Sequence, residues 1–305
     1  MRWRVFARHE SRLLFAEVSM ESILREELEQ GILVLTFNNA GPHNPVNRAL
    51  ERAIIAACRR AEENEAVRAV VLWGGPDRSF SAGGDFKEVK NHVGGAEVKE
   101  WIEGTLELYR SVLQLTKPTV AAVDRYAIGI GFQLALVCDW RVGTERCQFV
   151  MPELKHGIAC SLGSYMLEKS LGRLAMTELI YGCEPVEAST ARRMSLLNEL
   201  SSVPELLSSA RAAAARLAAY PQLPLRRTKR FANAGYIEGL REIATQSIAI
   251  HSEAFAQKTA QAHFKAVLGT KYTEGGSPAS GVVAQQAPAS LETQHVGGVA
   301  QNDHA

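Results

Sequence analysis

The stretch Ser79-Phe80-Ser81-Ala82-Gly83-Gly84-Asp85-Phe86 decides how this chain is interpreted. The apolar, β-branched residues 67–72 before it predict a buried strand, and residues 86–90 after it are typical of a helix start. The two glycines therefore fall at a strand-to-helix junction, where glycine permits a positive φ and lets a ligand approach the bare peptide. Backbone amides that begin a helix point outward without partners, which suits the binding of an oxyanion. A tight turn capped by Asp85 is the competing interpretation.

A second junction of the same kind follows at Tyr126-Ala127-Ile128-Gly129-Ile130-Gly131-Phe132-Gln133. Residues 118–123 predict another buried strand before it, and residues 134–138 an apolar helix after it. Two such junctions in one sheet can aim one amide each at a single carbonyl oxygen, which makes an oxyanion hole. Loss of one side-chain donor from such a hole costs about 2.7–4 kcal/mol in other enzymes, so this pair favours acyl chemistry.

Three segments together resemble the crotonase (enoyl-CoA hydratase/isomerase) superfamily. They are FSAGGDF at 80–86, AIGIGFQLALVCD at 127–139 and FVMPELKHGI at 149–158. The resemblance extends over about residues 26–272. It implies an α/β fold built as a spiral of ββα units, with a C-terminal helical region that covers the active site and builds a homotrimer or hexamer. It also implies a coenzyme A thioester as substrate and no permanently bound cofactor.

Further segments are most similar to a carbon–carbon bond-forming branch of the superfamily that serves carbapenem biosynthesis. They are PDRSFSAGGDFKEVK at 76–90, EWIEGTLELYRSVL at 100–113, GFQLAL at 131–136, FVMPELKHGIACS at 149–161 and HFKAVLGTKY at 263–272. This resemblance implies that malonyl-CoA is decarboxylated to an enolate, which adds to pyrroline-5-carboxylate. Hydrolysis of the resulting thioester then completes the reaction.

Catalytic roles follow from the same resemblance. Gly84 N–H and Ile130 N–H match the two oxyanion donors of the family. Glu153 matches its second glutamate and is expected to activate water, although an exposed surface position is the commoner fate of a glutamate. Gln133 stands where hydratases carry another Glu, and an amide cannot exchange a proton at neutral pH. A hydratase mechanism with two carboxylates is therefore not expected.

Binding roles are also implied for residues on both sides of these junctions. Gln133, Trp101 and His251 are expected to bind substrate, with His251 facing the second substrate. A core tryptophan and a structural histidine are the alternative interpretations. Contacts with the coenzyme are implied for Ala82, Gly84, Phe86, Lys265 and Lys271. The two lysines equally fit cations that complement the dipole of a helix end.

Length and composition divide the chain into four parts. Its 305 residues are 46% hydrophobic, which is ample for a sizeable core. We expect a flexible N-terminal extension at 1–22, an α/β core at 23–203 and a helical region at 204–272. Within that region, helices are predicted at 204–219, 223–234 and 237–268. Residues 273–305, rich in Gly, Ser, Pro, Ala and Gln, predict a disordered tail.

Charge and cysteine content limit the other functions. A net charge of +1 without an obvious basic stripe argues against nucleic acid, and no apolar run approaches the ~20 residues of a membrane span. Five scattered cysteines fit a reducing cytoplasm, and no cluster at ligand spacing suggests a metal. Two alternatives remain: an ordinary enoyl-CoA hydratase or isomerase, and a non-catalytic binding protein with the crotonase fold.

Overall fold

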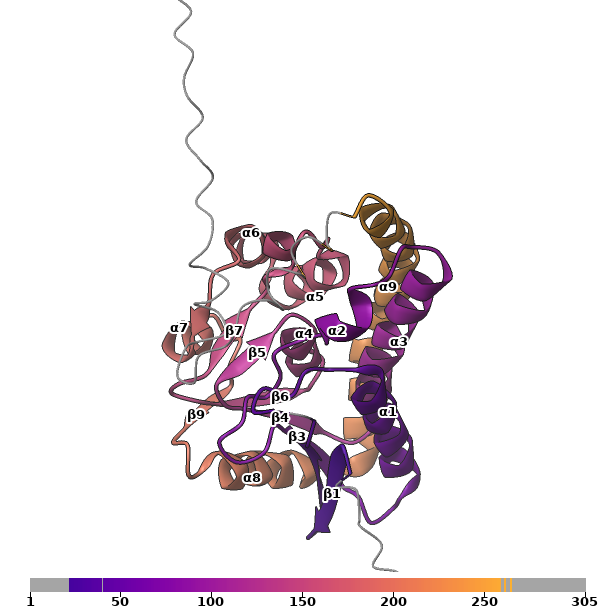
Figure 1. Cartoon of the computed structure of the whole chain (residues 1–305). Coiled ribbons are helices and arrows are strands. Elements are labelled where there is room, and N and C mark those ends of the chain that lie inside the picture. Colours follow the sequence, from indigo (N-terminus) through magenta and orange to yellow (C-terminus); the bar gives the residue numbers. More distant parts are fainter. Residues whose placement is uncertain (1–21, 40, 259–260, 262–263, 265–305) are drawn as a thin grey trace, which may run out of the picture.

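A six-stranded sheet forms the centre of the molecule (Figure 1), a computed structural model that describes residues 22–39, 41–258, 261 and 264. The strand order is β1-β2-β3-β4-β6-β9; β1 runs antiparallel to β2, and all other neighbours pair in parallel. The strands are β1 (Leu24–Glu29), β2 (Ile32–Phe37), β3 (Ala69–Trp73), β4 (Thr119–Val123), β6 (Trp140–Thr144) and β9 (Glu199–Ser201). The strands predicted at 67–72 and 118–123 correspond to β3 and β4.

A second, three-stranded sheet contains β5 (Tyr126–Ile128), β7 (Gln148–Val150) and β8 (Val186–Glu187). From β4 to β7 the chain alternates between the two sheets, placing one strand in each on every turn. An earlier turn contributes Ser81, which forms a parallel bridge with Ala127 of β5. This repeated alternation, with helices between the turns, produces the ββα spiral that was expected.

Both faces of the large sheet are buried, which explains why its parallel strands are almost continuously apolar. Alternate residues of a strand point to opposite faces, so Val70 and Leu72 of β3 enter one core while Ala69 and Val71 enter the other. The smaller core lies under helix α8 (Leu206–Ala218), which covers one face of the sheet in Figure 1. The larger core extends from the other face to the remaining helices and the functional site.

Helices α1, α3 and α9 lie side by side along one flank of the molecule, and α5 and α6 lie near its upper end in the view of Figure 1. Among the described residues, no helix is long and apolar enough to cross a bilayer. The other helices are α1 (Arg48–Glu63), α2 (Phe86–Val89), α3 (Ala96–Leu113), α4 (Ile130–Leu136), the 3₁₀ helix η1 (Glu153–His156), α5 (Ser161–Leu171), α6 (Arg173–Gly182), α7 (Ala188–Arg193) and α9 (Gln222–Ala256).

Two local predictions were wrong. The helices expected at 223–234 and 237–268 are one continuous helix, α9, that ends at Ala256. An interior glycine costs about 1 kcal/mol, and packing of residues such as Leu240 and Phe255 in the large core outweighs this cost at Gly235.

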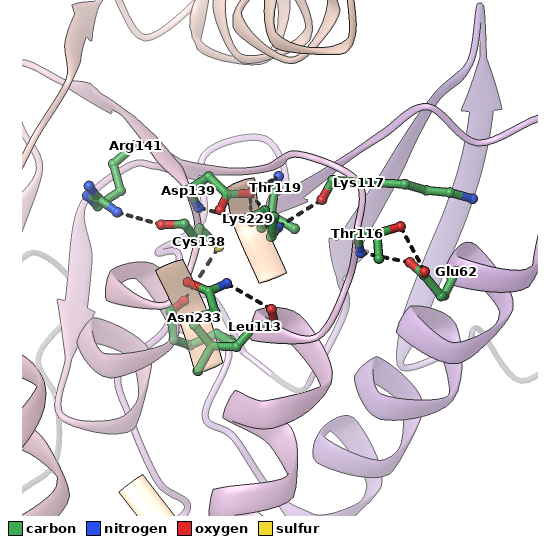
Figure 2. Close-up of polar contacts among 11 residues, drawn as sticks. Glu62, Leu113, Thr116, Lys117, Thr119, Cys138, Asp139, Arg141, Lys229 and Asn233 are labelled. Carbon is green, nitrogen blue, oxygen red and sulfur yellow. Dashed lines mark hydrogen bonds and ion pairs between the residues drawn. The ribbon is translucent and has the colours of Figure 1, made fainter. Parts of the chain in front are cut away.

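A buried polar cluster fastens the first half of α9 to the sheet (Figure 2). Lys229 donates hydrogen bonds from Nζ to the carbonyl oxygen of Lys117 at 2.8 Å and to Oδ2 of Asp139 at 2.5 Å. The same Oδ2 accepts bonds from the backbone N–H and the hydroxyl of Thr119 at the start of β4. Four residues further along α9, Asn233 donates to the carbonyl oxygen of Leu113. The helix is therefore held at the end of α3 and at the start of β4.

Candidate active site

The two predicted strand-to-helix junctions lie against each other. Gly83 and Gly129 both have a positive φ, of 91° and 50°. A Cβ atom on Gly83 would lie 2.7 Å from the carbonyl oxygen of Ile128, so only glycine fits between the two segments. Asp85 caps α2 by accepting a hydrogen bond from Lys87 N–H, as the capped-turn interpretation expected. The structure thus contains both the Asp85 cap and the close approach between Gly83 and the second junction.

The amides of Gly84 and Ile130 belong to these junctions. Ile130 N–H is the first of α4, where no intrahelical acceptor exists, and Gly84 follows the tight approach at Gly83. Neither amide has a hydrogen-bond acceptor within the described part of the chain. Both residues line a single cavity of about 140 Å³, so the structure brings the two predicted donors together.

This cavity also collects most of the other predicted site residues. Those that line it with Gly84 and Ile130 are Ala82, Phe86, Trp101, Gln133, Glu153 and His251. They come from both junctions and from α3, α4, η1 and α9. Lys265 and Lys271, predicted for coenzyme binding, lie outside the described residues.

Glu153 begins η1 at the end of β7, and its carboxylate faces the second junction. A Cβ atom on Gly129 would lie 3.2 Å from Oε1, which shows how closely the carboxylate approaches the Gly129–Ile130 peptide. Burial raises the pKa of Glu153 to about 7, although hydrogen bonds to the carboxylate oppose the shift. Oε2 is buried and has no hydrogen-bond partner among the residues described. A carboxyl group in this state can give or take a proton near neutral pH.

Gln133 holds the other oxygen of this carboxylate. Its Nε2 donates to Oε1 of Glu153 at 3.0 Å, and its Oε1 accepts a hydrogen bond from the Tyr109 hydroxyl at 2.7 Å. Because a hydroxyl donor fixes the oxygen side of the amide, the nitrogen side must face Glu153. Tyr109 is fully buried in the core on α3. The amide at this position therefore orients the single carboxylate and supplies no second acid.

Trp101 and His251 form the opposite wall of the cavity. Their rings meet edge to face with centroids 5.6 Å apart. His251 Nε2 lies 3.0 Å from the carbonyl oxygen of Ala159, and Nδ1 lies 2.8 Å from the carbonyl oxygen of Ser247 and 3.1 Å from its hydroxyl. Ser247 in turn accepts a hydrogen bond from Ser161 at the start of α5. Burial lowers the pKa of His251, so the ring is neutral near pH 7 and this network fixes its position.

Phe86 extends the cavity toward the end of the described chain. Its ring stacks on Phe264 with centroids 4.7 Å apart and meets His156 edge to face. Phe264 is fully buried although its neighbours in sequence lie outside the described residues. Phe264 is therefore connected to the cavity wall through its aromatic contact with Phe86.

Three residues of the site were not predicted: Tyr109, Thr105 and Cys160. Trp101, Thr105 and Tyr109 are spaced by four residues, so they share one face of α3 with the predicted tryptophan. That spacing was the available signal. Cys160 lines the cavity beside Glu153, and burial raises the pKa of its thiol, which keeps it uncharged. Within the described ranges, no group of three or more His, Cys, Asp or Glu residues could hold a metal ion.

The fold and this site define a crotonase, and comparisons with known proteins agree. The chain belongs to the enoyl-CoA hydratase/isomerase family, whose model matches residues 27–278. It is 44% identical over 247 residues to the carboxymethylproline synthase of Pectobacterium carotovorum subsp. carotovorum, covering 81% of this chain and 99% of that protein. It is therefore an enzyme of the crotonase superfamily, whose members act on coenzyme A thioesters.

More distant relatives include a hydratase and solved structures. The crotonyl-CoA hydratase of Syntrophomonas wolfei subsp. wolfei is 28% identical, over 78% of this chain and 90% of that protein. The structure of ThnE from S. clavuligerus is 35% identical with a TM-score of 0.65, covering 74% of this chain and 98% of that one. An enoyl-CoA hydratase from Bacillus halodurans, 20% identical with a TM-score of 0.74, covers 80% of this chain and all of its own, and supports the fold alone.

Proposed function

We propose that this protein is a carboxymethylproline synthase. It decarboxylates malonyl-CoA to an enolate, adds the enolate to pyrroline-5-carboxylate and hydrolyses the thioester to carboxymethylproline for carbapenem biosynthesis. The observation that carries the proposal is the pairing of one buried carboxylate, Glu153, with an amide, Gln133, across 3.0 Å. The similarity to the Pectobacterium carboxymethylproline synthase supports the same reaction.

The first step needs donors but no base. Gly84 N–H and Ile130 N–H donate to the thioester oxygen of malonyl-CoA. The bond between the α-carbon and the carboxylate breaks, carbon dioxide leaves, and the electron pair moves into the enolate. Because charge develops on the oxygen that the two amides face, their hydrogen bonds strengthen as the enolate forms. No ionisable side chain has to move a proton in this step.

The second step forms the carbon–carbon bond, and the third step uses the carboxyl group of Glu153. The enolate carbon attacks the imine carbon, which forms the new carbon–carbon bond and leaves the electron pair on the ring nitrogen, where a proton is taken up. Glu153, ionised, then takes a proton from a water molecule while the hydroxide attacks the thioester carbonyl. Coenzyme A departs as the thiolate. A carboxyl with a pKa of about 7 is about half ionised at neutral pH, which suits a general base.

The same proposal assigns the remaining predicted residues. Ala82 and Phe86 contact the coenzyme beside the first junction, and Lys265 and Lys271 pair with its phosphates. Trp101 and His251 face the imine. We also propose a homotrimer or a hexamer, because large apolar side chains are exposed on α6 and on α9: Leu174, Tyr181 and Phe231 are 72–87% exposed in the single chain.

One assay distinguishes this function from its rivals. The purified protein is given malonyl-CoA with and without pyrroline-5-carboxylate, and acetyl-CoA, the carboxymethylprolyl thioester and free carboxymethylproline are measured separately. The proposal expects free carboxymethylproline only when both substrates are present. Rapid hydration or isomerisation of an enoyl-CoA, without condensation, would instead identify an ordinary hydratase or isomerase. Binding of thioesters without any turnover would identify a binding protein.

A further inference from the structure

A hydroxyl in the cavity wall has no partner. Thr105 on α3 is 4% exposed and lines the cavity, and its Oγ1 is buried without a hydrogen bond in the described part of the molecule. A threonine inside a helix ordinarily donates to a carbonyl oxygen of the preceding turn. Thr105 does not, so its hydroxyl remains available to a molecule in the cavity. A buried hydroxyl left permanently unpaired costs about 1–3 kcal/mol.

The position of Thr105 is between the two ends of the site. One turn before it on α3, Trp101 packs against His251; one turn after it, Tyr109 reaches Gln133 and, through it, Glu153. Side chains four residues apart on a helix are neighbours, about 5–6 Å apart at Cβ. Thr105 therefore lies beside the space between the aromatic wall and the carboxylate.

The charges around this space limit which group the hydroxyl can meet. No lysine or arginine lines the cavity as far as the chain is described. Both ring nitrogens of His251 face backbone carbonyl oxygens, those of Ser247 and Ala159, and the Ser161 hydroxyl donates to the Ser247 hydroxyl. Thr105 is thus an uncommitted side-chain donor in a cavity whose described lining contains neither lysine nor arginine.

We propose that the Thr105 hydroxyl donates a hydrogen bond to the carboxylate of the imino-acid substrate and thereby selects for that carboxylate. This inference rests on the function proposed above. Two side-chain polar atoms lack partners among the described residues of the cavity wall, Thr105 Oγ1 and Glu153 Oε2, and an imino acid carries two polar groups. The ionised Glu153 repels a carboxylate but accepts a hydrogen bond from the protonated form of the imine nitrogen, so the carboxylate is left to Thr105.

The test compares two imines that differ only in the carboxylate, pyrroline-5-carboxylate and 1-pyrroline. Thr105→Val keeps the shape of the side chain and removes the hydroxyl, whereas Thr105→Ser keeps the hydroxyl. We expect Thr105→Val to lower kcat/KM for pyrroline-5-carboxylate by about 10- to 100-fold, the value of a hydrogen bond to a charged group. Its kcat/KM for 1-pyrroline and its decarboxylation of malonyl-CoA alone should stay near wild type, and Thr105→Ser should retain most activity.

Thr245→Val serves as the matched control, because Thr245 is an exposed helical threonine bonded to the Arg241 carbonyl oxygen on α9. Equal losses with both imines would overturn the proposal, since the hydroxyl would then act on the cavity or the enolate. Wild-type behaviour of Thr105→Val would overturn it as well. If Thr105→Val does not fold, Thr105→Ala is compared with Thr105→Ser in the same assay.

Failure of the proposed function gives a different result. In that case the wild-type protein condenses malonyl-CoA with neither imine, and the proposal for Thr105 falls with it. If the wild type does condense both substrates, the function stands whatever the Thr105 variants do, and only the ratio between the two imines decides the role of the hydroxyl.

Discussion

The side-chain amide of Gln133 donates a hydrogen bond to Glu153 Oε1 across 3.0 Å, and its own oxygen is held by Tyr109 at 2.7 Å. This arrangement gives the site one proton-transferring carboxyl group with a fixed orientation. A hydratase of the two-carboxylate type needs an acid and a base on either side of the double bond. Here the second position can only donate and accept hydrogen bonds.

The first prediction concerns hydration. Because Gln133 cannot deliver a proton, the wild-type protein should hydrate crotonyl-CoA far below the ordinary enzymatic range of about 1–10³ per second. Loss of the absorbance of the conjugated thioester measures the rate directly. Gln133→Glu should not create an efficient hydratase by itself, since placement of the water depends on the surrounding residues. Rapid hydration by the wild type would contradict the synthase assignment.

The second prediction separates the two halves of the reaction. Glu153→Ala and Glu153→Gln should still decarboxylate malonyl-CoA, because carbon dioxide departs without a base. Release of free carboxymethylproline should fall by about 10²–10⁴-fold, the usual contribution of a positioned acid–base group. Separate quantification of acetyl-CoA, the thioester and the free product checks this. Near-wild-type release of free product by Glu153→Gln would remove Glu153 from the mechanism.

The third prediction is a shift in pH dependence after Tyr109→Phe. The loss of the hydroxyl leaves the Gln133 oxygen unpaired and lets the amide turn that oxygen toward Glu153. The ionised carboxylate then loses a donor, so the pKa of Glu153 should rise above its value of about 7. Hydrolysis requires the ionised form, so its rising limb should move to higher pH by about one unit, corresponding to a lost hydrogen bond of roughly 1.5 kcal/mol.

Other titratable groups near Glu153 could also affect the pH dependence of hydrolysis. Besides Gln133, the thiol of Cys160 lies beside the carboxylate, and it stays uncharged in this range because burial raises its pKa. Tyr220→Phe is the matched control, since Tyr220 is exposed between α8 and α9. A reduced rate with an unchanged pH midpoint in Tyr109→Phe would indicate that Tyr109 only fills space.

The fourth prediction concerns the anchor of α9 in Figure 2. Lys229→Met keeps most of the apolar stem but leaves the Asp139 carboxylate without its cation. We expect the free energy of unfolding to fall by roughly 2 kcal/mol, below the 3–5 kcal/mol of fully buried pairs because Asp139 is 30% exposed. The melting temperature should drop by about 4–8 °C. Arg241→Met, which breaks the exposed pair with Glu238, should change it little.

The two junctions could be predicted from sequence because their signals are local. Gly129 directly follows β5, and Gly83 lies ten residues beyond β3, just before α2, so each positive φ falls in the segment that leads from a strand to a helix. The burial of Glu153 could not be predicted in this way. The sequence around Glu153 favoured an exposed glutamate, and only the resemblance to the family indicated a buried base. Its contact with Gln133 joins two elements twenty residues apart, and no local pattern encodes that distance.

The unpredicted residues of α3 illustrate the same limit. Thr105 and Tyr109 repeat at helical spacing from Trp101, but the spacing alone does not say which face of a helix borders a cavity and which borders the core. The division of α9 at Gly235 was wrong because a local propensity was weighed without the packing on either side of it. The domain boundaries and the roles of Lys265 and Lys271 stay predictions.

Lys229 and His251 belong to the same uninterrupted helix, about 33 Å apart at 1.5 Å per residue. The helix is anchored to the sheet at Lys229 and contributes one wall of the cavity at His251. A single rigid element therefore connects a distant anchor to the site of the chemistry. A small tilt of α9 at Lys229 becomes a larger displacement of the His251 imidazole. Libraries that aim to admit bulkier imines should therefore include Lys229, Asp139 and Asn233, although none of these residues borders the cavity.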